Sequence, residues 1–293
     1  MLDLAQNTLD GLALGASYSL LALGFTLIFG VLRRMNLSYG PAVLFGCYCA
    51  TWTHLNFQAG LIALALVTIA ATVLAGAYVE RLCFAPHRRG SAVAAMVASF
   101  ALWMQIEEVA MLAMPRHIYP FPQLFEGAPL QFAGLSLPGD ALVMLAATAA
   151  VCVLLHRLLY RSRFGLAVRA AIDNPLAASL AGIELARTFV LVFALASAIG
   201  GLAGYLIVAS HGQVTPMLGM WSTLKGLLAM MLGGLGSLPG AVLGGLALGL
   251  IEAHSQWFFG PQARDLVAYL LLFALLAARP AWMTRWTTIR SAS

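Results

Sequence analysis

The chain has 293 residues, of which 61% are hydrophobic and only 9% are charged, and its mean hydropathy is +0.90. A soluble domain carries roughly 25% charged and about 45–50% apolar residues, so this composition excludes a soluble globular protein. The net charge is +5 at pH 7. The basic residues lie in short connections between apolar runs and form no patch interleaved with aromatic residues, which argues against nucleic-acid binding. Composition therefore predicts a polytopic membrane protein.

Nine apolar stretches approach the roughly 20 residues that a helix needs to cross about 30 Å of hydrocarbon. They are Leu9–Val31, Pro41–Leu55, Gly60–Val79, Val93–Met114, Ala141–Leu159, Thr188–Ala209, Met217–Gly233, Ala241–Trp257 and Leu266–Ala278. Pro41–Leu55 and Met217–Gly233 are short enough to be broken or re-entrant, which is allowed only where protein or a watery cavity covers the backbone. We expect an all-α bundle of eight or nine transmembrane segments, in a single transmembrane domain that spans residues 1–293.

Arginine positions predict which connections face the cytoplasm. The basic connections are Arg33–Arg34, Glu80–Gly90 (ERLCFAPHRRG), Arg161–Arg187 and the tail from Arg279 to Arg290. Pro115–Gly139 is poor in basic residues and is expected outside. Nine crossings would place the N-terminus outside and the C-terminus inside, whereas eight crossings and one re-entrant segment would place both ends inside.

Small residues recur at every fourth position in three of the stretches. They are Gly11, Gly15 and Ser19, then Gly200 and Gly204, then Gly240, Gly244 and Leu248 with Gly245 and Gly249. Such spacing lets two helix backbones approach closely in lipid, so it predicts tight helix contacts.

The polar segment Arg161–Arg187 lies between two apolar stretches and contains the residues that typically begin and end two short helices. Phe164–Ile172 can form about two turns, Asn174 is a suitable N-cap, and Pro175 suits the first position of a second helix. Gly182 can end that helix. A plain loop would need no such signals.

Two interpretations of this segment stay open on physical grounds. One is a solvated connector stabilised by Arg169 and Asp173, four residues apart on a helix. The other is a docking element that enters a groove on a cytoplasmic partner.

The glycine-rich segment Gly233–Gly245 (GGLGSLPGAVLGG) is not a phosphate-binding loop. A Walker motif requires Lys-Ser or Lys-Thr after its glycines, and no segment supplies that pattern. The segment is either a structural hairpin or part of the lining of a substrate path. No nucleophile elbow, catalytic triad or metal-ligand spacing is visible, so we expect no enzymatic activity, no catalytic residue and no metal site.

Met35–Gly46 (MNLSYGPAVLFG) interrupts two apolar stretches with Asn36, Ser38, Tyr39 and Gly40. Transporters often bind cargo at broken helices, because the freed backbone groups can contact it. A simple cytoplasmic turn with Gly40–Pro41 as its breaker is the alternative.

A few polar residues fall inside apolar stretches, where they are costly and indicate function. Gln105, Glu107 and Glu108 belong to one stretch, near its outer end. Lys225 is the only lysine in the chain. It can pair with Glu252 across neighbouring helices or contact cargo.

Four segments together resemble the LivH-type permeases of ABC importers for branched-chain amino acids, and the likeness covers nearly the whole chain. DGLALGASYSLLALGFTLIFGV is similar to the opening helix of the family. ERLCFAPHRR resembles its Glu-Arg…Arg-Pro-x-Arg loop, with Ala85 where arginine is usual. SRFGLAVRAAIDNPLAASLAGI is close to its cytoplasmic coupling segment, and VTPMLGMWSTLKGLLAMMLGGLGSLPGAVLGG is close to its glycine-rich hairpin, including Lys225.

The resemblance implies a type II-like ABC importer permease in the bacterial inner membrane, with the segment 161–187 and the C-terminus in the cytoplasm. It implies a second homologous permease, two cytoplasmic ABC ATPases that use the ATP, and a periplasmic binding protein, with no cofactor in this chain. Phe164–Ile172 and Pro175–Ala181 would transmit ATPase closure. The expected coupling residues are Phe164, Gly165, Arg169, Asp173, Asn174, Pro175 and Gly182. The candidate path or gate residues are Asn36, Ser38, Tyr39, Gly40, Gln105, Lys225, Gly233, Gly234 and Gly236.

One departure from the family concerns the cargo. The family's Asn-Phe-Ala-His-Gly-Glu stretch is replaced by Asn36–Pro41, which lacks the histidine and the glutamate. Branched-chain or related amino acids remain the expected cargo, with urea, short amides or aromatic acids as alternatives. A different class, a self-sufficient secondary transporter or channel, would use Glu107, Glu108 or Glu252 as a proton relay. An integral membrane enzyme is the third class.

Overall fold

The computed structural model describes residues 2–88, 90–116, 118–125, 127, 130–132 and 135–278. Arg89 of the predicted cytoplasmic loop and the basic tail from 279 to 290 lie outside the described residues.

In the part of the chain that the structure describes, nine long helices contain the nine predicted apolar stretches, except that Gly60 and Met114 are the cap residues of their helices. The helices are α1 (Leu2–Leu32), α2 (Tyr39–Phe57), α3 (Leu61–Val79), α4 (Ala92–Ala113), α5 (Gly139–Arg161), α8 (Leu185–His211), α9 (Met217–Gly233), α10 (Leu238–Phe259) and α11 (Ala263–Ala278). A π-helical turn, η1 (Glu80–Phe84), extends α3. Two short helices, α6 (Arg163–Asp173) and α7 (Pro175–Leu180), lie between α5 and α8.

Six described helices are long and apolar enough to cross a membrane by length and composition. They are Asp3–Leu32, Leu61–Phe84, Ala92–Ala113, Gly139–Arg161, Leu185–His211 and Leu238–Phe259. Met217–Gly233 is apolar but shorter. The chain is therefore a mostly helical, multi-pass bundle.

Among the described residues, two small antiparallel sheets depart from the predicted all-α class. β1 (Tyr119–Pro120) pairs with β4 (Gln213–Val214), and β2 (Leu130–Phe132) pairs with β3 (Leu135–Leu137). The physical reason is that the connection between α4 and α5 contains prolines and no helical pattern, so its backbone groups pair across strands instead. The side chain of Gln6 adds to this region by accepting from the backbone N–H of Ser136 (2.9 Å) and donating to its carbonyl oxygen (2.8 Å).

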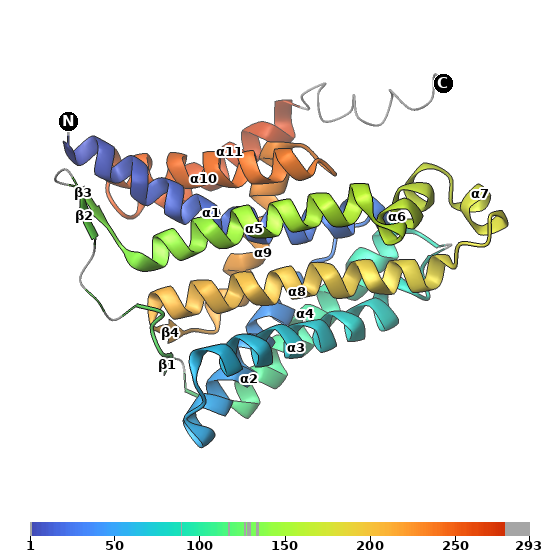
Figure 1. Cartoon of the computed structure of the whole chain (residues 1–293), viewed down its shortest axis with the longest axis horizontal. Helices are drawn as coiled ribbons and strands as arrows, with labels where there is room; N and C mark the ends of the chain where they lie inside the picture. Colours follow the sequence, from blue (N-terminus) through green and yellow to red (C-terminus); the bar gives the residue numbers. More distant parts are fainter. Residues whose placement is uncertain are drawn as a thin grey trace.

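Most long helices run along one direction, which fixes the two ends of the bundle (Figure 1). The N-terminus and the strands lie at one end, and α6 and α7 project from the other (Figure 1). α9 crosses the long helices at a steep angle in the interior (Figure 1). The strands of the connection predicted outside the cell and the helices of the segment Arg161–Arg187, predicted inside, thus lie at opposite ends.

α1 packs on α10 through the predicted small residues. A Cβ atom on Gly15 would lie 2.7 Å from the Cα of Leu246, and one on Gly249 would lie 2.3 Å from the backbone nitrogen of Gly15. The Ser19 hydroxyl donates to the carbonyl oxygen of Val242 at 2.9 Å. Backbone contact at this distance maximises van der Waals packing, which replaces the hydrophobic drive in lipid. The predicted tight contact is confirmed for these two helices.

Replacing Gly249 by Ala should destabilise the bundle by about 1–3 kcal/mol, because the new methyl group would push α10 away from α1. Thermal unfolding of the purified protein in detergent measures this loss. Gly60→Ala is the matched control, since Gly60 caps α3 at φ −72° and a Cβ there meets nothing within 4 Å. Equal melting temperatures for the two variants would contradict the packing account.

Candidate functional site

The segment between α5 and α8 forms the two capped helices that its sequence predicts. Ser162 caps α6 by accepting from the Gly165 N–H at 3.0 Å. Asn174 breaks the helix and caps α7 by accepting from the Ala177 N–H at 3.0 Å. Gly182 ends the pair at φ +84°, a conformation that favours glycine. The predicted boundaries differ from the observed ones by one residue at most.

The first helix of the pair is fixed to the end of α5. Gly165 is buried, and a Cβ atom on it would lie 2.2 Å from the carbonyl oxygen of Leu159. The Arg169 guanidinium donates to the same carbonyl and lies 5.5 Å from the ring centre of Tyr160. Phe164 is half-buried against the core. α6 therefore packs directly against the end of α5.

The second helix presents apolar side chains to solvent. Leu176 is 71% exposed and Leu180 is 82% exposed, and Leu166 of α6 is also exposed. Asp173, Asn174 and Pro175 lie at the exposed corner between the helices. Exposed leucines on a capped element at the end of a bundle form an apolar surface of the kind that a protein or a membrane covers.

The segment before α2 enters the bundle and does not form a simple surface turn. Asn36 and Ser38 are buried, and Asn36 Oδ1 accepts from the Ser38 N–H at 3.0 Å. The Ser38 hydroxyl donates to the carbonyl of Ser99, about two turns inside α4. The start of α2 therefore lies inside the bundle, about two helical turns beyond the N-terminal end of α4.

Tyr39 and Gly40 then contact the helices of the interior. The Tyr39 hydroxyl donates to the carbonyl oxygen of Ala196 in α8 at 3.2 Å. The Gly40 N–H donates to Oγ1 of Thr223 in α9 at 3.2 Å, and a Cβ at Gly40 would lie 2.0 Å from the carbonyl oxygen of Gly219. The segment thus contacts three helices of the interior, with Ser38 on α4, Tyr39 on α8 and Gly40 on α9.

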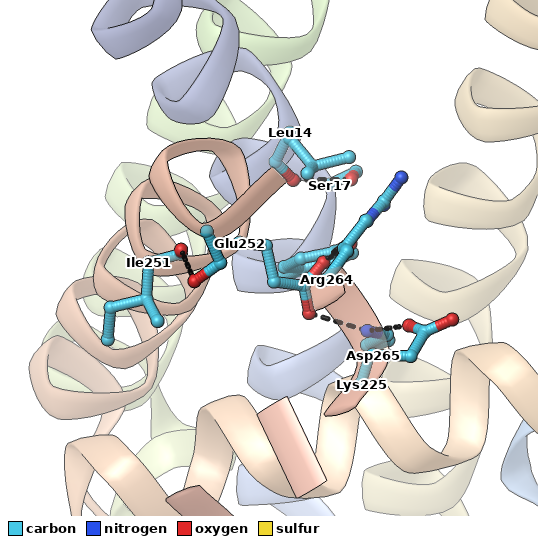
Figure 2. A network of polar contacts seen from close by, with 9 residues as sticks. Leu14, Ser17, Lys225, Ile251, Glu252, Arg264 and Asp265 are labelled. Carbon is cyan, nitrogen blue, oxygen red and sulfur yellow. Dashed lines mark hydrogen bonds and ion pairs between the residues drawn. The ribbon is translucent and has the colours of Figure 1, made fainter. Parts of the chain in front are cut away.

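Lys225 belongs to a network of charges that is fully buried at its centre (Figure 2). Its ammonium lies 2.5 Å from Glu252 Oε1 and 2.8 Å from Asp265 Oδ1. Arg264 Nε lies 2.9 Å from Glu252 Oε2, and the Tyr18 hydroxyl donates to that oxygen at 2.6 Å. Lys225 and Glu252 are both 0% exposed. The predicted pairing of these two residues is confirmed.

The network joins α1, α9, α10 and α11 and is balanced in charge. Two cations face two anions, and the rings of Tyr18, Trp221 and Tyr269 lie about Lys225, with centres 5.8, 6.0 and 5.9 Å from its ammonium. Isolated buried charges are strongly unfavourable, whereas a paired and hydrogen-bonded set is tolerated. The network therefore fixes α11 to α9 and α10.

Sequence reasoning missed three members of this network. Arg264 and Asp265 form an isolated charged pair directly before the last apolar stretch, and Tyr18 is a polar ring inside the first. A search for counter-charges to Lys225 and Glu252 could have found the pair.

The glycines after α9 form a tight turn. Gly234 and Gly236 have φ values of +95° and +83°. A Cβ at Gly233 would lie 1.9 Å from the carbonyl oxygen of Gly240, and Gly236 lies beside Gly30 of α1. The hairpin interpretation fits this geometry.

The remaining polar residues of α4 face different ways. Gln105 is exposed and its Oε1 accepts from the Tyr78 hydroxyl at 3.2 Å. Glu107 is half-buried, and its Oε2 accepts from Trp103 Nε1 at 2.6 Å. Glu108 is exposed. The candidate path residues thus form separate groups, because Gln105 and Lys225 lie apart from the segment that starts α2.

A metal site needs several His, Cys, Asp or Glu ligands close together. Within the described part of the chain, no group of three or more such residues could hold a metal ion.

A family model and the similar proteins found by comparison agree on one kind of protein. The family model described as branched-chain amino acid transport system / permease component matches residues 7–276. The chain is 28% identical over 288 residues to the high-affinity branched-chain amino acid transport system permease protein LivH of Escherichia coli K12, covering 94% of this chain and 93% of that protein. It is 29% identical over 287 residues to the corresponding protein BraD of Pseudomonas aeruginosa, covering 94% of each.

Among solved structures, the fold is similar to that of an inward-facing ABC transporter assigned to the metal-chelate type. The TM-score is 0.53 at 17% identity, and the match covers 94% of this chain and 86% of that one. At this identity the likeness concerns the fold alone.

Replacing Lys225 by Met should cost about 3–5 kcal/mol of stability, because Glu252 would lose its nearest cation while fully buried. Thermal unfolding and the yield of monodisperse protein measure the effect. In the double variant Lys225→Met with Glu252→Gln, the loss of stability should be smaller than in the single variant. The buried side chain that has lost the ammonium of Lys225 is then neutral. Arg163→Gln, at an exposed position, is the control for loss of a cation. A single variant as stable as the control would exclude a structural role for the network.

Proposed function

The chain belongs to the permease-component family of branched-chain amino acid transport systems, and we propose that it is the membrane subunit of an ABC importer for branched-chain or closely related amino acids. The relatives over nearly its whole length are permeases of that kind. Its fold matches a solved ABC transporter chain.

One observation carries the proposal, namely the exposed helix pair α6–α7. The pair is capped at each end, is held to α5 by Gly165 and Arg169, and exposes Leu176 and Leu180. Such an element suits a contact through which another subunit moves the bundle. We assign the coupling role to Phe164, Gly165, Arg169, Asp173, Asn174, Pro175 and Gly182.

The partners follow from this role. Within these 293 residues there is no Walker pattern, so the energy of ATP hydrolysis has to arrive through contact with ATPase subunits. We propose two such subunits, a second homologous permease and a periplasmic binding protein that delivers the amino acid.

We place nine segments across the inner membrane, with the N-terminus outside and the C-terminus in the cytoplasm. The chain leaves β4 at the end that holds the strands, and α9 carries it to Gly236, which lies beside Gly30 near the opposite end of α1. α10 then returns antiparallel to α1, since Gly245 meets Ser19 while Gly249 meets Gly15. This course favours a crossing at α9 over a re-entrant loop.

The path for cargo is proposed where the start of α2 meets α9. Asn36, Ser38, Tyr39 and Gly40 lie there in the interior, with Thr223 as the α9 contact. Because this segment lacks the family's histidine and glutamate, urea, short amides or aromatic acids are the alternative cargo. A self-sufficient proton-coupled transporter is less well supported, since Glu252 is engaged by two cations.

Replacing Leu180 by Glu should reduce co-purification of the ATPase subunits at least about tenfold and abolish amino-acid uptake. An unpaired carboxylate in an apolar contact costs more than the ~1.4 kcal/mol that a tenfold change represents. Membrane insertion and thermal unfolding of the chain should be unchanged, because Leu180 is 82% exposed.

Leu180→Met is the matched control, because it retains an apolar side chain of similar size, and it should behave as wild type. Normal ATPase co-purification and uptake by Leu180→Glu would refute the docking role.

A further inference from the structure

A cavity of about 340 Å³ lies between α2 and α4, apart from the residues assigned above. Its lining is mostly apolar and consists of Phe45, Tyr48, Cys49, Trp52 and Thr53 of α2 with Ala110, Ala113 and Met114 at the end of α4. The α2 residues are three or four positions apart and so lie on one face of the helix. The side chains of the two alanines on α4 are small, so the space opposite that face stays open. Pockets for small molecules measure about 300–1,000 Å³, so the cavity has room for one small ligand.

The cavity has one polar group whose hydrogen bonding is incomplete. Tyr48 is only 3% exposed, and its buried hydroxyl has no hydrogen-bond partner. The other hydroxyl of the lining, that of Thr53, donates to the carbonyl oxygen of Cys49 at 2.8 Å. A buried hydroxyl without a partner is unfavourable, so its presence in an apolar cavity indicates a ligand that supplies the missing bond.

A carboxylate lies next to the cavity on its inner side. Glu107 is one helical turn from Ala110 and so lies on the same face of α4. Its Oε2 accepts from Trp103, while its Oε1 lies 3.5 Å from the position of a Cβ atom at Gly219. Gly219 in turn touches Gly40, where the proposed cargo path begins. Glu107 therefore lies near both the α4 face that lines the cavity and the α9 residue that contacts the start of the proposed path.

We propose that this cavity binds an amino acid with a branched aliphatic side chain before it enters the path. The aliphatic side chain fills the apolar space, the Tyr48 hydroxyl donates to the ligand carboxylate, and Glu107 accepts from its ammonium group. The inference rests on the proposed function for the identity of the ligand. In the proposed topology the C-terminal ends of α2 and α4 lie at the outer side, where a binding protein releases its cargo.

The first test titrates the purified complex of this chain and its partner subunits with leucine, followed by Trp52 fluorescence. Trp52→Phe identifies the signal of this residue among the six tryptophans. Tyr48→Phe should raise the apparent Kd for leucine about tenfold, because a bond to a charged group is lost. It should leave the melting temperature of the unliganded protein unchanged or higher, since the hydroxyl has no partner to lose.

The second test changes the size of the cavity. Ala113→Leu should lower the preference for leucine over valine about tenfold, because aliphatic pockets discriminate by single methylene groups on this scale. Ala101→Leu is the matched control, an identical substitution at an exposed position of the same helix outside the lining. Its leucine-to-valine ratio should equal that of wild type.

The outcomes separate the site from the proposed function. Wild-type leucine uptake combined with unchanged leucine binding in Tyr48→Phe and Ala113→Leu would overturn the site and leave the importer standing. An equal response to leucine and lysine, or loss of the second permease from Ala113→Leu, would also overturn the site, by assigning the cavity to unspecific binding or to a subunit contact. Leucine binding with the predicted variant effects, without any uptake, would retain the site and reject the importer.

Discussion

The structure depends on one constraint, namely that its helices must pack together in lipid, where the hydrophobic effect does not favour their association. In lipid the apolar side chains gain little by leaving one helix surface for another, so backbones must approach closely to hold together. α1 meets α10 at Gly15, Gly245 and Gly249, where even one methyl group would collide with the opposite backbone. The central position of α1 then sets where α8, α9 and α5 pack around it.

The buried charges depend on the same packing. Lys225 and Glu252 lie fully inside the bundle, and they can do so only because α9 and α10 bring them to 2.5 Å. Arg264 and the half-exposed Asp265 close the network from α11. Since a buried pair adds little net stability but is costly to break, its effect is to specify one arrangement of these helices. The alignment of α9 also determines which of its residues meet the start of α2.

Much of this fold follows from local sequence signals. All nine apolar stretches form helices, and the caps at Asn174 and Gly182 define α7, because these signals act over a few residues. Pairing of Lys225 with Glu252 could be expected, since each is an isolated charge in an apolar stretch. The pairing of β1 with β4 could not, because it joins segments far apart in the chain. The depth at which α2 begins depends likewise on contacts with α4, α8 and α9. The sequence could not predict the apolar cavity for a similar reason. The face of α2 lines a cavity only because the small residues of α4 lie opposite it in the folded bundle.

The central claim is that energy enters this chain by contact at α6–α7 and that the chain alone cannot drive transport. Its most direct test reconstitutes the purified chain in vesicles, first alone and then with its second permease, ATPases and binding protein, and measures leucine accumulation with and without ATP. Accumulation that requires both the partners and ATP is the predicted result. ATP-independent accumulation by the chain alone would contradict the account.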